Sequence, residues 1–344
     1  MQYCFFTLIA ATGRIYLKNT GKEPAGTLMD NMKNNIMKRI VNNMSKIIVG
    51  KEKASRLLVI SLAAEGHVLL EDVPGIGKTT MAYAMAKSVG LSFNRIQFTP
   101  DILPSDITGF TVFNQKINDF EYRSGNIMSN IILADEINRT SPKTQASMLE
   151  AMEEKQVTVD GKTYKLPKPF MVIATQNPVE YMGTYPLPEA QLDRFLMKIS
   201  IGYPTKTEES SILYRFQKSN PLHDLKPVAS LEELTELQAH VRNVRVDESL
   251  AAYIVDLVTA TRKHDMVSLG CSPRASLSLF RAAQAAAVYD GRDFVIPEDI
   301  RDLAVPVLSH RLVLKQEAKI KRITNESIIS EIVSRQTIPV KAKV

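Results

Sequence analysis

Short apolar runs alternate with helically spaced segments as far as residue 203. Four runs have the length and apolar content of buried strands: His67–Leu70, Arg95–Phe98, Ile131–Ala134 and Phe170–Ala174. Between them, segments such as Lys78–Val89 place apolar residues at helical spacing. Strands that alternate with helices predict an α/β fold, with a mainly parallel sheet covered by helices on both faces.

The pattern changes after residue 203, where no convincing strand follows and helical patterns succeed one another. The predicted helices, several with an acidic or Ser/Pro start, are Leu231–His240, Asp247–His264, Pro273–Tyr289 and Pro297–Leu308. We therefore expect an αβα nucleotide-binding core at 29–203, a linker region at 204–230 and an all-α lid domain at 231–344. Residues 1–28 lack periodic burial and contain the turn-forming stretch Thr20–Gly26, so they are predicted to be a disordered tail.

Composition and charge remove several classes of protein. The chain of 344 residues is 44% hydrophobic, and because no run of 18 apolar residues occurs, we expect no membrane insertion. The two cysteines, Cys4 and Cys271, are too few for a disulfide framework. We therefore expect the protein to be located in the reducing cytoplasm. The formal charge of +6 arises at the two ends, while residues 54–310 sum to −5. A nucleic-acid partner is therefore not expected, since phosphate binding needs clustered cations.

The segment Gly75-Ile76-Gly77-Lys78-Thr79 carries the strongest chemical signal, because it lies between a predicted strand and a predicted helix. Glycines let backbone N–H groups approach phosphates, the lysine reaches the β- and γ-phosphate oxygens, and the threonine hydroxyl ligates Mg²⁺. We predict that ATP binds here, in contact with Pro74, Gly75, Ile76, Gly77, Lys78, Thr79 and Thr80. The strict phosphate-loop pattern would place Gly at position 72, where Asp72 stands.

The apolar run that ends in Asp135-Glu136 supplies a second set of candidates. Asp135 is predicted to hold Mg²⁺ together with Thr79, and Glu136 to polarise the attacking water. A third apolar run ends in Thr175-Gln176-Asn177, and Asn177 is predicted to contact the attacking water or the γ-phosphate. The acidic pair favours hydrolysis over binding alone, so a nucleotide-sensing scaffold is the less favoured interpretation.

The order of these segments resembles the AAA+ ATPases, and three motifs are similar to the MoxR family. The motifs are Leu69–Thr79, Ala134–Arg139 and Glu189–Phe195, and the resemblance covers about residues 33–340. It implies that Asn177 is sensor 1. It also implies that Arg194 is the arginine finger, which reaches the γ-phosphate bound to the neighbouring subunit, and that Arg274 is sensor 2, which projects from the lid toward the nucleotide.

Two insertions match this branch of the AAA+ proteins. Ser105–Gly125 corresponds to the helix-2 insert, and Val157–Leu166 alternates around the turn dipeptide Asp160-Gly161, which predicts a hairpin. In related rings these features face the central pore. Phe110 and Phe113 are therefore candidates for contact with a client, although an aromatic pair near a glycine is more often packing.

The resemblance implies a homo-oligomeric ring, a hexamer, that hydrolyses ATP with Mg²⁺ and remodels or matures a client protein, often one with a von Willebrand factor A domain. One alternative is the ATPase subunit of a magnesium-chelatase-like complex, which shares the helix-2 insert. A DNA-acting motor is another alternative, and the acidic middle of the chain argues against it.

Overall fold

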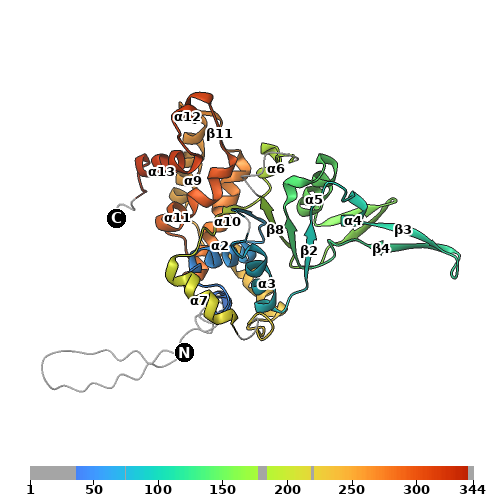
Figure 1. Ribbon diagram of the computed structural model, residues 1–344. Coiled ribbons are helices and arrows are strands. Elements are labelled where there is room, and N and C mark those ends of the chain that lie inside the picture. The colour runs from blue at the N-terminus through green and yellow to red at the C-terminus, as the bar shows by residue number, and fades with distance from the viewer. Residues whose placement is uncertain (1–35, 74, 177–183, 218–220, 340–344) are drawn as a thin grey trace, which may run out of the picture.

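A five-stranded parallel sheet forms the centre of the computed structural model, which describes residues 36–73, 75–176, 184–217 and 221–339 (Figure 1). The strands, in spatial order, are β2 (Phe93–Gln97), β5 (Ile131–Asp135), β8 (Met171–Gln176), β1 (Val68–Glu71) and β9 (Met197–Ile199). The predicted α/β fold class is confirmed. Because all five strands run in one direction, the loops that follow them gather at one edge, which we call the carboxyl edge, and the residues that precede them lie at the amino edge.

Alternate residues of each strand face different helices, as strand geometry requires. Val68 and Leu70 pack with helical residues 36–45, α2 (Glu52–Ala63) and α3 (Lys78–Val89), whereas Leu69 packs with α5 (Pro142–Glu154) on the opposite face. Both faces of the sheet are therefore covered. None of the described helices is long and apolar enough to cross a membrane.

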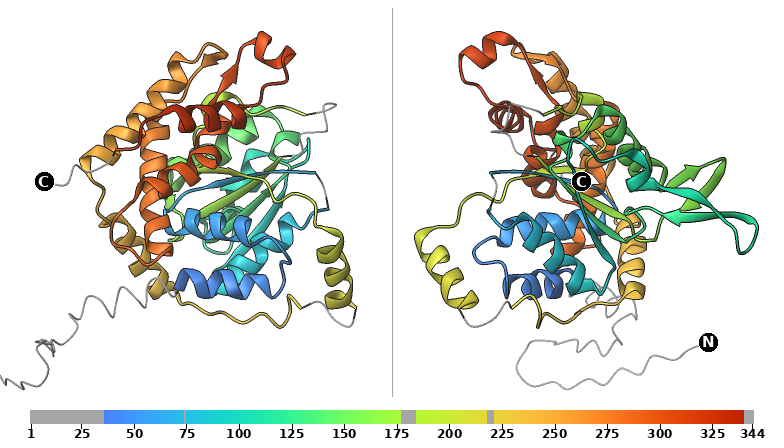
Figure 2. Two further views of the ribbon diagram at one scale, coloured as in Figure 1. Left: turned by 90° about the vertical axis from the view of Figure 1, so that its left-hand side faces the viewer. Right: turned by 45° about the vertical axis from the view of Figure 1, so that its right-hand side comes forward.

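The second half of the described chain is mainly helical and packs against α2 (Figures 1 and 2). Its longer helices are α8 (Leu231–Arg242), α9 (Glu248–Lys263), α10 (Pro273–Tyr289), α11 (Pro297–Leu308) and α13 (Asn325–Arg335). Side-chain oxygens of Ser230, Ser272 and Thr324 accept backbone N–H groups at the starts of three of them. The apolar residues of this lid continue into the cluster that covers one face of the sheet, so core and lid share a hydrophobic interior.

Several elements differ from the sequence-based expectations. The lid contains two short paired strands, β10 (Val267–Leu269) and β11 (Val313–Leu314), which are too short to produce a periodic pattern. The region expected to be a linker contains helix α7 (Lys206–Phe216), whose start is capped by Thr205. Strand β9 was also not predicted. Short helical segments complete the order: α4 (Pro104–Thr108), η1 (Ile137–Arg139), α6 (Glu189–Leu192), η2 (Ser309–Arg311) and α12 (Gln316–Ile320).

Two hairpins project from the sheet layer (Figure 1), of which only the one around Asp160-Gly161 was predicted. The longer pairs β3 (Gly109–Asn114) with β4 (Asp119–Ser124), and the shorter pairs β6 (Gln156–Val159) with β7 (Lys162–Lys165). The predicted turn at Asp160-Gly161 is confirmed, with both residues at positive φ. The rings of Tyr122 and Tyr164 stack at 3.8 Å, so the two hairpins support one another.

Candidate functional site

The glycine loop joins β1 to α3 at the carboxyl edge of the sheet. Gly75 and Gly77 have φ of +83° and +92°, a region that residues with a Cβ rarely adopt. The position that a Cβ would take at either glycine has no described atom within 4 Å. Thr79 and Thr80 lie in the first turn of α3, whose free N–H groups favour an anion. The loop thus has the backbone geometry of a phosphate cradle; Pro74 lies outside the described residues.

Asp72, which stands where the strict phosphate-loop pattern has glycine, forms hydrogen bonds with the segment after β9. Its carboxylate accepts hydrogen bonds from the Ser200 hydroxyl at 3.0 Å and from the backbone N–H groups of Ile201 and Gly202. These residues follow β9 and lead toward α7. Asp72 therefore ties the phosphate loop to the segment that connects the sheet to α7, a contact that glycine could not make.

The Lys78 ammonium group lies between the loop and the acidic residues of the site. Its Nζ donates to the backbone oxygen of Asp72 at 2.6 Å. Burial lowers the pKa of Lys78, and the negative charges of Asp135, Asp72 and Glu136 oppose that shift. The structure thus brings Lys78 and both predicted acidic residues together.

Asp135 ends β5 and is almost completely buried. One carboxylate oxygen accepts from the Thr175 hydroxyl at 2.6 Å, and the other accepts from Nη2 and Nε of Arg95 at 2.6 and 3.0 Å. A buried carboxylate near the hydroxyl-bearing first turn of α3 offers the hard oxygen ligands that Mg²⁺ prefers, so the donor set fits this ion. Arg95, on the edge strand β2, forms an ion pair with Asp135. It was not among the predicted residues.

Glu136 is held in a left-handed backbone conformation, with φ of +59°, which is uncommon for a residue with a side chain. Its carboxylate accepts from Gln97 Nε2 at 2.9 Å and from Arg139 Nη1 at 3.1 Å, and its backbone N–H donates to the Thr175 hydroxyl. Sequence reasoning missed Gln97 and Thr175. Their signal was present, because Gln97 is a polar residue within the run Arg95–Phe98 and Thr175 directly follows the run Phe170–Ala174. Asn177, two residues beyond Thr175, lies outside the described residues.

An apolar cavity of about 400 Å³ adjoins the glycine loop. Residues 47–49 and Ile76 form one side, while Tyr203 and the α7 residues Ile212 and Phe216 form the other. Arg215 anchors α7 by donating to the backbone oxygens of Ser45 and Lys46 at 3.0 and 2.8 Å. This cavity could not be predicted from the sequence, because its walls come from segments about 160 residues apart.

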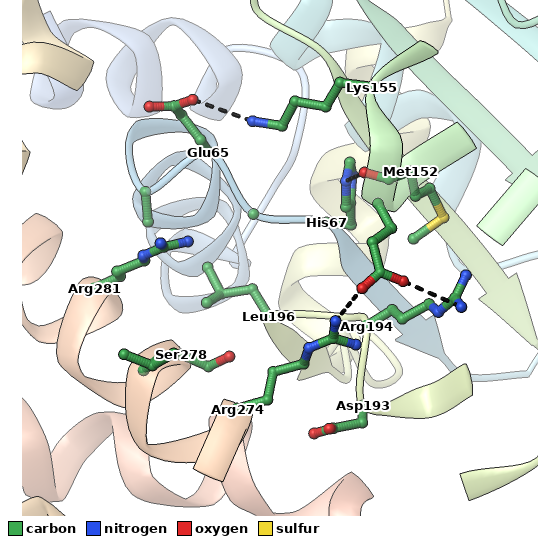
Figure 3. A pocket seen from close by; sticks show the side chains of 14 residues that line it. Glu65, His67, Met152, Lys155, Asp193, Arg194, Leu196, Arg274, Ser278 and Arg281 are labelled. Atoms are coloured by element: carbon green, nitrogen blue, oxygen red, sulfur yellow. Dashed lines mark hydrogen bonds and ion pairs between the residues drawn. The ribbon is translucent and has the colours of Figure 1, made fainter. Parts of the chain in front are cut away.

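The two candidate arginines lie away from the glycine loop. Arg194 precedes β9, and because Met197 of β9 pairs in parallel with Val68 of β1, Arg194 lies at the amino edge beside His67. Arg274, in the first turn of α10, lies there as well, and both side chains pair with Glu153 (Figure 3). The glycine loop follows the other end of β1, whose four residues span roughly 13 Å. The structure thus brings Arg194 and Arg274 to each other and not to Lys78 of their own chain.

Buried polar contacts fix this edge. Asp193 accepts from Arg311 Nε at 2.7 Å and from the Ser272 hydroxyl at 2.8 Å, which joins the loop before β9 to two segments of the lid. The Val172 N–H donates to Nδ1 of His67, whose Nε2 lies 3.1 Å from the Met152 oxygen. Asp193, His67 and Met152 line a cavity of about 320 Å³, together with Arg194 and Arg274.

Comparisons with protein families agree with this architecture. The model for the "ATPase family associated with various cellular activities (AAA)" matches residues 67–197, and the model for the "AAA lid domain" matches residues 259–332. The chain is 55% identical to YeaC of Bacillus subtilis over 306 residues, which cover 89% of this chain and 96% of YeaC. It is 42% identical over 312 residues to the chaperone MoxR1 of Mycobacterium tuberculosis, covering 88% of this chain and 82% of MoxR1.

A solved structure supports the same relationship. The crystal structure of a protein from Cytophaga hutchinsonii, described as an ATPase, superposes with a TM-score of 0.86 at 40% sequence identity. The match covers 92% of this chain and 98% of the other.

Proposed function

The chain belongs to the MoxR family of AAA+ ATPases, and from this premise we propose how its residues bind and hydrolyse ATP. The N–H groups of the glycine loop and Lys78 hold the phosphates, and the apolar cavity between residues 47–49 and α7 takes the base. Thr79 and Asp135 hold Mg²⁺, which supplies charge neutralisation at the phosphates when it is bound. Glu136 then orients and deprotonates the attacking water, with Asn177 as a further contact.

Hydrolysis in this proposal requires two subunits. The proposal is supported by the position of Arg194 and Arg274, which lie at the amino edge and cannot reach the glycine loop of their own chain. In a ring, here a hexamer, each subunit presents these arginines to the ATP of its neighbour. Arg194 would stabilise the charge that develops on the γ-phosphate, and Arg274 would contact the same nucleotide from the lid.

Mixing two inactive variants tests this arrangement. Arg194→Ala subunits should bind ATP but lose on the order of 10³-fold or more in turnover, as arginine fingers do. Lys78→Ala subunits lose nucleotide affinity but keep Arg194. Rings formed from both variants should regain part of the activity, since some interfaces then combine an intact loop with an intact finger. If the two subunits co-assemble and no activity returns, or if a strictly monomeric preparation has full activity, the shared site is wrong.

The proposed work of the ring is remodelling or maturation of a client protein in the cytoplasm, including clients with a von Willebrand factor A domain. The β3–β4 hairpin supports a client contact, because Phe110, Phe113 and Phe120 are about half exposed or more although they are aromatic. The buried free thiol of Cys271 is compatible with a reducing compartment.

A further inference from the structure

A single carboxylate lies between the two arginines of the amino edge. One oxygen of Glu153 is 3.1 Å from Nη2 of Arg194, and its other oxygen accepts from Nη2 of Arg274. In Figure 3, dashed lines join the guanidinium groups of Arg194 and Arg274 to the unlabelled carboxylate between them. Of the other acidic residues that line this cavity, Glu65 pairs with Lys155 and Asp193 with Arg311, so Glu153 is the acidic partner shared by the two arginines. Without the carboxylate, Arg194 and Arg274 would repel each other.

The helix that carries Glu153 is rigidly placed. Helix α5 has 13 residues, or roughly 20 Å at 1.5 Å each, and buries Met148, Leu149 and Met152 against the sheet. At its other end, Gln145 donates to the backbone oxygens of Ile137 and Thr140, in the segment that follows Glu136. The backbone of Glu153 is therefore held against the sheet, whereas Arg274 comes from the lid.

The contact leaves both arginines able to bind a further anion. A guanidinium group has five N–H donors, and Glu153 engages Nη2 of each arginine. The side chains of Arg194 and Arg274 are 28% and 44% exposed, so a second subunit can reach them. A carboxylate placed in this way fixes the orientation of the donors and does not occupy all of them.

We propose that Glu153 is a positioning residue that holds the arginine finger and the lid arginine together for the nucleotide of the neighbouring subunit. This inference rests on the proposed function. It predicts that Glu153 acts on the neighbour's site and not on the ATP site of its own chain. Loss of the Glu153 charge should therefore slow the chemical step, while ATP binding, which depends on the glycine loop, stays unchanged.

The variant Glu153→Gln tests the role of the charge with little change in size. Glutamine carries no charge and has an NH₂ donor in place of one carboxylate oxygen, so it cannot keep both arginine contacts in the present geometry, in which each arginine contacts a different oxygen. We expect kcat to fall roughly tenfold to a hundredfold, with KM for ATP within about twofold of the wild type. Glu154→Gln is the matched control. Glu154 is the next residue on the exposed end of α5 and, among the described residues, has no ion pair with either arginine.

Mixed assembly separates positioning from a folding defect. Glu153→Gln subunits retain their own glycine loop, and Lys78→Ala subunits retain Glu153 and both arginines, so mixed rings should recover activity. A defect in the fold of the Glu153→Gln subunit itself would not be repaired by a neighbour. Wild-type turnover by Glu153→Gln overturns the inference. The inference is also overturned if Glu153→Gln mixed with Lys78→Ala regains no activity under conditions in which Arg194→Ala mixed with Lys78→Ala does. If Arg194→Ala also fails to recover with Lys78→Ala, the proposed function is itself wrong.

Discussion

The carboxyl and amino edges of the sheet carry different kinds of site. At the carboxyl edge, the glycine loop follows β1 directly and Asp135 and Glu136 close β5, so each group of functional residues is contiguous in the sequence. At the amino edge, Glu153 and Arg274 lie 121 positions apart and meet only because α10 of the lid packs beside the end of α5. The first site depends on local strand–loop geometry. The second depends on how the lid docks against the sheet layer.

The largest expected effect comes from separating binding and hydrolysis at the carboxyl edge. Glu136→Gln should retain ATP and hydrolyse it at least about a hundredfold more slowly, because the water-activating carboxylate is lost. Lys78→Ala should lose nucleotide affinity, because the cation that contacts the phosphates is gone. Nucleotide binding by fluorescence and phosphate release measure the two properties separately. Wild-type turnover by Glu136→Gln would show that Glu136 is not the base.

At the amino edge, the contribution of His67 to the free energy of unfolding should depend on pH. Burial lowers the pKa of His67 from 6.5 to about 4. In this interval the unfolded state binds more protons than the folded state, so the contribution of His67 to stability is lost as pH falls from about 6.5 toward 4, by about 3 kcal/mol in total.

Chemical unfolding of the wild type and His67→Gln at several pH values measures this contribution. A glutamine can still accept from the Val172 N–H and donate to the Met152 oxygen, but it does not titrate. The stability advantage of the wild type over the variant should therefore shrink with decreasing pH. A difference that stays constant between pH 7 and 4.5 would contradict the lowered pKa, and the comparison of two chains cancels the other titrating groups.

A smaller effect, on nucleotide affinity, is expected from substitutions in α7 where it lines the apolar cavity. Phe216→Ala should weaken ATP and ADP binding equally, about tenfold, because it removes apolar surface from the proposed base pocket and does not touch the phosphates. Tyr214→Ala is the control, since Tyr214 lies on α7, is 75% exposed and does not line the cavity. Equal effects of the two variants would place the base elsewhere.

The prediction of the fold was most successful where elements are long or have strong caps. Helices Pro273–Tyr289 and Pro297–Leu308 agree with the structure at both ends, because a proline begins each one and the apolar spacing continues to its last turn. Strand β9 and the lid strands β10 and β11 have two or three residues each and lie below the length at which a period can be recognised. Their pairing is fixed by the neighbouring segments.

The candidate residues of the carboxyl edge could be predicted from local sequence patterns alone. A strand, a glycine turn and a helix N-terminus are local features, and so is a strand that ends in Asp135-Glu136. Two other sets of contacts appear only in the folded chain. Arg95 and Gln97 of the edge strand contact these acids, and Arg194 and Arg274 meet Glu153 at the opposite edge. Such contacts could not be predicted because they depend on the order of the strands and on how the lid docks. Both are set by burial of apolar surface over the whole chain and leave no mark on the residues that happen to meet.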